Sequence, residues 1–137
     1  MARLKQVAAL PVRRNRQGAR QVMLVTSRET RRWVIPKGWP HRGIADYAAA
    51  AKEAHEEAGV VGETRRKRIG KYRYHKRRSR DVVEIDVNVY LLEVSEEKAR
   101  WPEQHERKRA WFSLAAAAEA VEEEELKDII ATLESRE

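Results

Sequence analysis

The segment from Pro36 to Val60 reads PKGWPHRGIADYAAAAKEAHEEAGV and carries most of the information in this chain. Its first eight residues hold two prolines and two glycines, a composition that is typical of a loop. The next part, 46–58, holds four consecutive alanines and predicts a helix, with Asp46 as its N-cap and Gly59 as its C-terminal stop. We therefore expect a loop that leads directly into a helix.

The predicted helix has a small-residue face and an acidic face. At 100° per residue, one side collects Tyr47, Ala50, Ala51, Ala54 and Ala58, which permits close packing on a sheet. Glu53, Glu56 and Glu57 lie at i, i+3 and i+4, so their carboxylates project from one surface. Carboxylates this close repel one another, and a shared cation explains them best; hard oxygen ligands favour Mg²⁺ or Mn²⁺ over zinc. A solvated acidic face is the alternative that these three residues alone leave open.

Strand patterns flank this segment at 4–12, 21–26 and 33–35 before it, and at 63–78, 82–94 and 108–112 after it. The 82–94 stretch alternates most clearly, with aliphatic residues at every second position from Val83 to Leu91. A polar turn at 77–81 predicts a hairpin with the preceding basic stretch. Two helices, or one interrupted helix, are predicted over 114–133, with the glutamates from Glu122 to Glu125 in solvent. Without a repeat or a linker, this length predicts a single domain over residues 1–137.

The composition excludes several classes of site. The chain has no Cys, which rules out disulfides, thiolate metal sites and a cysteine nucleophile, and which fits a reducing compartment. No apolar run approaches the roughly 20 residues of a transmembrane helix. The apolar stretch at the N-terminus is too short for a secretory signal. We therefore expect a cytoplasmic protein that has no membrane partner.

The charge is strongly basic and unevenly distributed. The chain has 29 basic and 22 acidic residues, which gives a net charge of +7. Between Arg65 and Arg80 there are ten basic residues and no acidic one. Such a balance predicts a polyanionic partner, such as a nucleotide, an inositol phosphate or a nucleic acid, without choosing among them.

The Pro36–Val60 segment resembles the signature of the Nudix hydrolases, which is Gly, five residues, Glu, seven residues, Arg-Glu, an aliphatic residue, any residue, Glu-Glu, any residue, Gly and an aliphatic residue. The matching positions, all in register, are Gly38, Glu53, Ala54, Glu56, Glu57, Gly59 and Val60. The first signature Glu falls on Ile44 and the Arg on Lys52, which keeps a charge but lacks the planar fork of arginine. The Pro36-Lys37-Gly38-Trp39 sequence also looks like that of members acting on diphosphoinositol polyphosphates and dinucleoside polyphosphates.

The resemblance implies an α/β fold of the Nudix type, an α/β/α sandwich in which helices flank a mixed β-sheet. It also implies Mg²⁺-dependent hydrolysis of a phosphoanhydride bond in a small-molecule polyphosphate. In that case the metal ligands are the Gly38 carbonyl, Glu53, Glu56 and Glu57, with Glu103 in a later loop as the first candidate for a further carboxylate. Lys52 takes the place of the arginine that orients the catalytic glutamates. The expected substrate-binding residues are Lys37, Arg32, Arg77, Arg78 and Arg80.

Two other functions remain open from the sequence. The basic hairpin suggests RNA as a partner, with Tyr72 and Tyr74 stacking on bases, and hence an enzyme that removes pyrophosphate from RNA 5′ ends. The departures at Ile44 and Lys52 suggest a catalytically weak module that binds a nucleotide or RNA. The sequence does not predict the oligomeric state.

Overall fold

The protein is represented by a computed structural model that describes residues 3–136. Within these residues an eight-stranded sheet has the central order β3-β2-β1-β7-β5. Three further strands pair with this path: β4 with β1, β6 with β7, and β8 with β2. β1 and β7 run parallel and the other pairs are antiparallel, which makes the sheet mixed. The strands are β1 (Arg3–Arg14), β2 (Arg20–Thr26), β3 (Trp33–Val34), β4 (Lys37–Gly38), β5 (Val60–Thr64), β6 (Gly70–Arg77), β7 (Val82–Glu97) and β8 (Arg109–Ser113).

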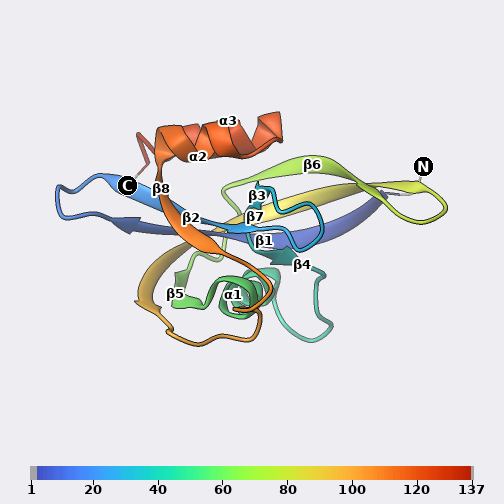
Figure 1. The fold of residues 1–137 in the computed structure, drawn as a ribbon, viewed down its shortest axis with the longest axis horizontal. Coiled ribbons are helices and arrows are strands. Elements are labelled where there is room, and N and C mark those ends of the chain that lie inside the picture. The colour runs from blue at the N-terminus through green and yellow to red at the C-terminus, as the bar shows by residue number, and fades with distance from the viewer. Residues whose placement is uncertain (1–2, 137) are drawn as a thin grey trace.

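The helices cover the two faces of this sheet. Helix α1 (Asp46–Ala58) lies on one face, and α2 (Leu114–Ala120) and α3 (Glu124–Thr132) lie on the other (Figure 1). This arrangement confirms the predicted α/β/α fold with a mixed sheet. It also shows two separate helices over 114–133. None of the helices in residues 3–136 is long and apolar enough to cross a membrane.

Strand β7 divides the core between the two helical layers. Its residues at every second position from Val83 to Leu91 are buried in the cluster beneath α2 and α3. Tyr90 and Leu92 point the other way, into the cluster with the alanines of α1. β1 lies beside β7 and is buried without interruption from Gln6 to Val12, because helices cover both faces there.

The predicted loop before α1 is tied to the centre of the sheet. Lys37 and Gly38 form the short strand β4 and pair with Ala8 and Val7 of β1. A two-residue strand inside a Gly/Pro-rich segment leaves no periodic pattern, so the sequence predicted only a loop. The pairing fixes Gly38 beside α1.

Two other local predictions need correction. Asp46 lies in the first turn of α1, and Ala45 is the N-cap, with extended backbone and no side-chain hydrogen bond. Asp46 still favours the helix there by interacting with its dipole.

The 63–78 stretch is two strands, β5 and β6, because the long strand β7 pairs with both of them, one after the other along the same edge. Gly59 ends α1 in the left-handed conformation, as predicted (φ 67°).

Candidate active site

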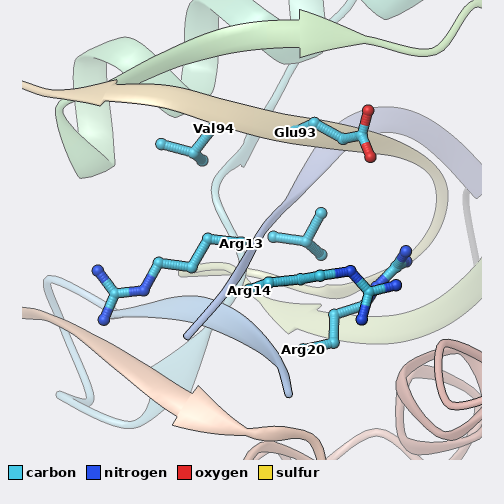
Figure 2. Close-up of a pocket in the computed structure, with 6 residues that line it drawn as sticks. Arg13, Arg14, Arg20, Glu93 and Val94 are labelled. Atoms are coloured by element: carbon cyan, nitrogen blue, oxygen red, sulfur yellow. The ribbon is translucent and has the colours of Figure 1, made fainter. Parts of the chain in front are cut away.

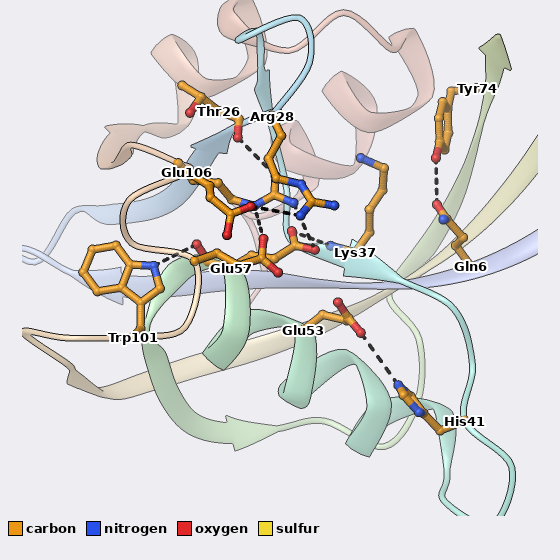
Figure 3. Close-up of polar contacts among 12 residues, drawn as sticks. Gln6, Thr26, Arg28, Lys37, His41, Glu53, Glu57, Tyr74, Trp101 and Glu106 are labelled. Carbon is orange, nitrogen blue, oxygen red and sulfur yellow. Dashed lines mark hydrogen bonds and ion pairs between the residues drawn. The ribbon is translucent and has the colours of Figure 1, made fainter. Parts of the chain in front are cut away.

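Two of the three helix glutamates are buried. Glu53 is 9% exposed and Glu57 is 6% exposed, whereas Glu56 is partly buried. The interpretation of this face as a solvated acidic surface is therefore wrong for Glu53 and Glu57. Both side chains lie between α1 and the short strand β4, close to the centre of the sheet (Figure 3).

Glu53 packs directly on the backbone of Gly38. A Cβ atom at position 38 would lie 2.5 and 2.6 Å from the two carboxylate oxygens of Glu53, so only glycine allows this approach. Nε2 of His41 lies 3.8 Å from Oε2 of Glu53. Burial, followed by repulsion from Glu56, raises the pKa of Glu53, while a hydrogen bond with the Glu57 carboxyl opposes the rise. Glu53 and Glu57 are thus two neighbouring buried carboxyl groups on α1.

Glu57 is held by two cationic residues. Its Oε1 accepts a hydrogen bond from the backbone N–H of Lys37 at 3.3 Å, and its Oε2 lies 3.6 Å from Nη2 of Arg107. Burial nevertheless raises the pKa of Glu57 to about 8, against the attraction of Arg107 and Lys37. Burial also lowers the pKa of Lys37 to about 8, which Glu57 opposes. The Lys37 ammonium lies 5.1 Å from the centre of the Tyr74 ring, whose hydroxyl donates to Gln6 (Figure 3).

Arg107 joins the helix to the loop before β8. Its Nε donates to Oε1 of Glu103 at 2.6 Å and its Nη1 to the Thr26 carbonyl at 3.2 Å, in addition to the contact with Glu57. Its side chain is only 9% exposed. One buried guanidinium thus brings Glu103, the predicted loop acid, close to Glu57. The sequence reasoning missed Arg107, although its i+4 spacing from Glu103 was a usable signal.

The same loop caps the C-terminal end of α1. The last carbonyls of a helix have no partner within it, and here four successive ones are satisfied from outside α1. The carbonyl oxygens of Glu56 and Gly59 accept hydrogen bonds from the backbone N–H groups of Glu103 and Lys98. The carbonyl oxygen of Glu57 accepts from Nε1 of Trp101, and that of Ala58 accepts from Nη1 of Arg109. Arg109 in turn stacks on the ring of Trp101 at 3.8 Å. The loop that carries Glu103 is therefore fixed to the helix that carries Glu56 and Glu57.

The predicted substrate-binding residues fall into two groups. The first group, Lys37 and Arg32, lies near the glutamates of α1, and Lys37 is beside Glu57. Arg32 forms an ion pair with Glu123 at 2.8 Å. Nη1 of Arg32 is buried and has no hydrogen-bond partner in residues 3–136. Arg77, Arg78 and Arg80 lie at the tip of the β6–β7 hairpin, which extends away from α1 (Figure 1). The hairpin tip begins three residues beyond Tyr74, which is about 10 Å along the strand.

Several charged and aromatic residues differ from their predicted environment. Positions 72 and 74 share the face of β6 that turns toward the core, and the Tyr72 side chain is 2% exposed and packs there. Tyr72 is therefore not available to stack on RNA bases. Glu123 pairs with Arg32, and Glu125 accepts the backbone N–H of Arg73, so these two glutamates are not a free solvated face.

The two positions that depart from the signature are on the surface. Ile44 is 44% exposed, and Lys52 is exposed on α1. Neither packs in the core, so the departures do not disturb the fold around Glu53.

The donor set fits a hard divalent cation. Two carboxyl groups are buried side by side on α1, and burial raises the pKa of both because it disfavours their ionised forms. Carboxylate and carbonyl oxygens are the ligands that Mg²⁺ and Mn²⁺ prefer. No three His, Asp or Glu side chains converge closely enough to form a metal site in the part of the chain that the structure describes. A third carboxylate, from Glu56 or Glu103, has to turn toward the pair to complete one.

Comparisons with known proteins agree with this arrangement. Nudix hydrolase 4 of Arabidopsis thaliana is 38% identical over 99 residues, which cover 72% of this chain and 46% of that protein. The chain spans about half the length of the curated relatives it matches.

Two solved structures share the fold at low sequence identity. The C. elegans Ap4A hydrolase in a binary complex aligns with a TM-score of 0.69 and 17% identity over 96% of each chain. The NUDIX domain of Shewanella oneidensis NrtR, complexed with ADP ribose, aligns with a TM-score of 0.70 and 17% identity over 98% of this chain and 89% of that one. A family model described as NUDIX domain matches residues 3–133. The chain therefore belongs to the Nudix family.

Proposed function

We propose that this protein is a Mg²⁺-dependent pyrophosphohydrolase whose substrate is a dinucleoside polyphosphate or a diphosphoinositol polyphosphate, with Mn²⁺ as a second usable ion. The observation that carries this proposal is the buried pair of Glu53 and Glu57 next to the backbone of Gly38 and the backbone N–H of Lys37. Enzymes of the Nudix family generally use divalent metal ions. The names of the relatives support hydrolysis, and the names of the two solved structures point to Ap4A and ADP ribose as their ligands.

The proposed metal ligands are the Gly38 carbonyl and the carboxylates of Glu53, Glu56 and Glu57, with Glu103 as a further ligand. A bound divalent ion supplies charge neutralisation on the phosphates and a more acidic water. Glu53 is our candidate for the group that accepts the proton of this water, because its carboxylate lies against the Gly38 backbone and has His41 as its ion-pair partner among residues 3–136. Lys37 and Arg32 lie on the β6 side of these glutamates, where they can bind phosphate oxygens.

A substrate panel tests this proposal. Ap4A, a diphosphoinositol polyphosphate, ADP ribose and a 5′-triphosphorylated RNA are each incubated with the protein in Mg²⁺, in Mn²⁺ and in EDTA, and released phosphate and products are measured. We expect turnover of one of the first two substrates that EDTA abolishes. Preferential turnover of the RNA would favour the RNA 5′-end alternative. Tight binding without turnover of any substrate would favour the binding module.

Restoring the two signature residues is expected to speed the reaction. Ile44→Glu combined with Lys52→Arg should raise kcat by about tenfold, or roughly 1.4 kcal/mol of barrier, by orienting Glu53. Both positions are exposed, so the new charges need no desolvation and the melting temperature should stay unchanged. Steady-state kinetics on the preferred substrate provide the measurement. An unchanged kcat in a folded double variant would mean that these positions do not limit catalysis.

The hairpin tip is expected to act on large substrates only. Replacing both Arg77 and Arg80 by Gln should raise KM for a long polyphosphate about fivefold and leave kcat unchanged, because the α1 site is intact. The effect should shrink with added salt. A matched control, Arg16→Gln with Arg100→Gln, removes two exposed arginines elsewhere and should leave KM unchanged. Equal responses of the two double variants would mean that only the net charge matters.

A further inference from the structure

A second concave site lies at the β1–β2 hairpin end of the sheet. Its volume is about 330 Å³, and its lining residues are Val12, Arg13, Arg14, Arg20, Glu93 and Val94 (Figure 2). A neighbouring hollow of about 380 Å³ shares Arg14 and Arg20 with it. None of these residues belongs to the proposed catalytic machinery. Arg14 is six residues beyond Ala8, the β1 partner of Lys37, which places it about 20 Å along the strand from β4.

The register of the β1–β2 hairpin places two like charges opposite each other in this pocket. Arg14 lies directly across the β1–β2 ladder from Arg20, an arrangement that is destabilising when nothing compensates it. Burial, and then the charge of Arg14, lower the pKa of Arg20, and Arg65 and Arg136 add to this repulsion. Glu93 is the acidic residue that counteracts it. The pocket therefore holds more positive than negative charge.

Arg20 also has an unused hydrogen-bond donor. Its Nη1 atom is buried and has no hydrogen-bond partner in residues 3–136. A buried donor without an acceptor costs free energy, so the contacts within residues 3–136 leave the guanidinium of Arg20 incompletely satisfied. The other arginines are engaged differently, since Arg14 donates to the Gly18 carbonyl, and Arg13 points away toward Gln21 and Glu97 (Figure 2).

We propose that Arg14 and Arg20 form a binding site for the di- or polyphosphate group of a small molecule, separate from the α1 site. The planar guanidinium group matches phosphate oxygens with two parallel hydrogen bonds, and two such groups lie together here. An anion between Arg14 and Arg20 compensates the opposition of their like charges. The volume lies in the range of small-molecule sites, and Val12 and Val94 offer apolar contact to the rest of the ligand.

Titration calorimetry with sodium tripolyphosphate tests this site in the full chain, with EDTA present and the ionic strength held constant. Arg20→Gln should weaken the affinity at least about tenfold, as expected for the loss of a hydrogen bond to a charged group, and Arg14→Gln should do the same. The matched control is Arg16→Gln, which removes an exposed charge from the same hairpin without touching the pocket and should keep the affinity within about twofold. Arg100→Gln, which removes an exposed arginine that does not line the pocket, should also leave it unchanged.

Thermal unfolding without ligand gives an independent readout. Arg14→Gln and Arg20→Gln should unfold at the same temperature as the parent protein or higher, because each relieves the repulsion across the ladder. Added tripolyphosphate should raise the melting temperature of the parent and of Arg16→Gln, and should raise it less in the two pocket variants. The site is refuted if the parent does not bind tripolyphosphate, or if Arg16→Gln or Arg100→Gln weakens binding as much as Arg20→Gln.

Discussion

Glu57→Gln is expected to lower kcat by at least about a hundredfold in Mg²⁺, which corresponds to roughly 3 kcal/mol of lost transition-state stabilisation. The amide keeps the shape of the side chain and its contact with the backbone N–H of Lys37, but it removes a charged oxygen from the proposed metal site. Single-turnover and steady-state rates of phosphate release provide the measurement. The matched control is Glu119→Gln, an exposed glutamate on α2, which should keep full activity. A Glu57→Gln protein with normal turnover at limiting Mg²⁺ would remove this residue from the site.

The same variant should change how stability depends on pH. Because the pKa of Glu57 is about 8 in the folded protein and near 4.5 in the unfolded chain, the folded state binds the proton more tightly. Its contribution to stability is therefore greatest below pH 4.5 and is lost as the pH rises to about 8. Denaturant unfolding in EDTA should show a decline over this range that is smaller in Glu57→Gln. The lowered pKa of Lys37 acts above pH 8, where it makes stability rise with pH.

Mg²⁺ should reduce this decline in the parent protein, because a bound cation stabilises the ionised carboxylate. The stabilisation by Mg²⁺ should therefore grow between pH 5.5 and 8 in the parent and be small at every pH in Glu57→Gln. An equal gain in both proteins would place the ion elsewhere.

The periodic parts of the sequence predicted the structure well. The helix at 46–58 and the alternation from Val83 to Leu91 were read correctly, because an alanine-rich helix and a two-sided strand each leave a repeating pattern. The spacing of the glutamates indicated a cluster of Glu53, Glu56 and Glu57 on one surface of the helix. It did not reveal their burial, which depends on β4 bringing the backbone of Gly38 against α1.

The errors concern contacts between distant parts of the chain. Strand alternation placed Tyr72 and Tyr74 on one face of β6, but only the packing of α3 decides that this face is inside. The sequence predicted that the glutamates around the start of α3 lie in solvent. In the structure Glu123 binds Arg32 and Glu125 binds the backbone of Arg73, each more than 50 residues away in the chain. No local pattern contains such pairings.

Arg107 is expected to have the largest effect on stability among the residues that sequence reasoning missed. Arg107→Gln should lower the free energy of unfolding by about 3 kcal/mol at pH 9 in EDTA, because it removes the buried contacts of Arg107 with Glu57, Glu103 and the Thr26 carbonyl together. Denaturant unfolding measures this loss. The matched control is Arg28→Gln, whose ion pair with Glu106 is exposed and should be worth less than about 1 kcal/mol.

A double-mutant cycle separates this electrostatic role from simple packing. In the Glu57→Gln background the loss caused by Arg107→Gln should shrink by about 1 kcal/mol at pH 9, where Glu57 is mostly ionised in the parent, since the neutral amide no longer needs a compensating charge. Mg²⁺ should stabilise Arg107→Gln more than the parent, because the ion then supplies the positive charge that the carboxylates of Glu57 and Glu103 have lost. If Arg107→Gln is as harmless as Arg28→Gln, or if its cost is the same with and without the Glu57 charge, Arg107 does not hold these carboxylates. If the cycle does show the coupling, Arg107 is a positioning residue that keeps the acidic cluster assembled when no metal is bound.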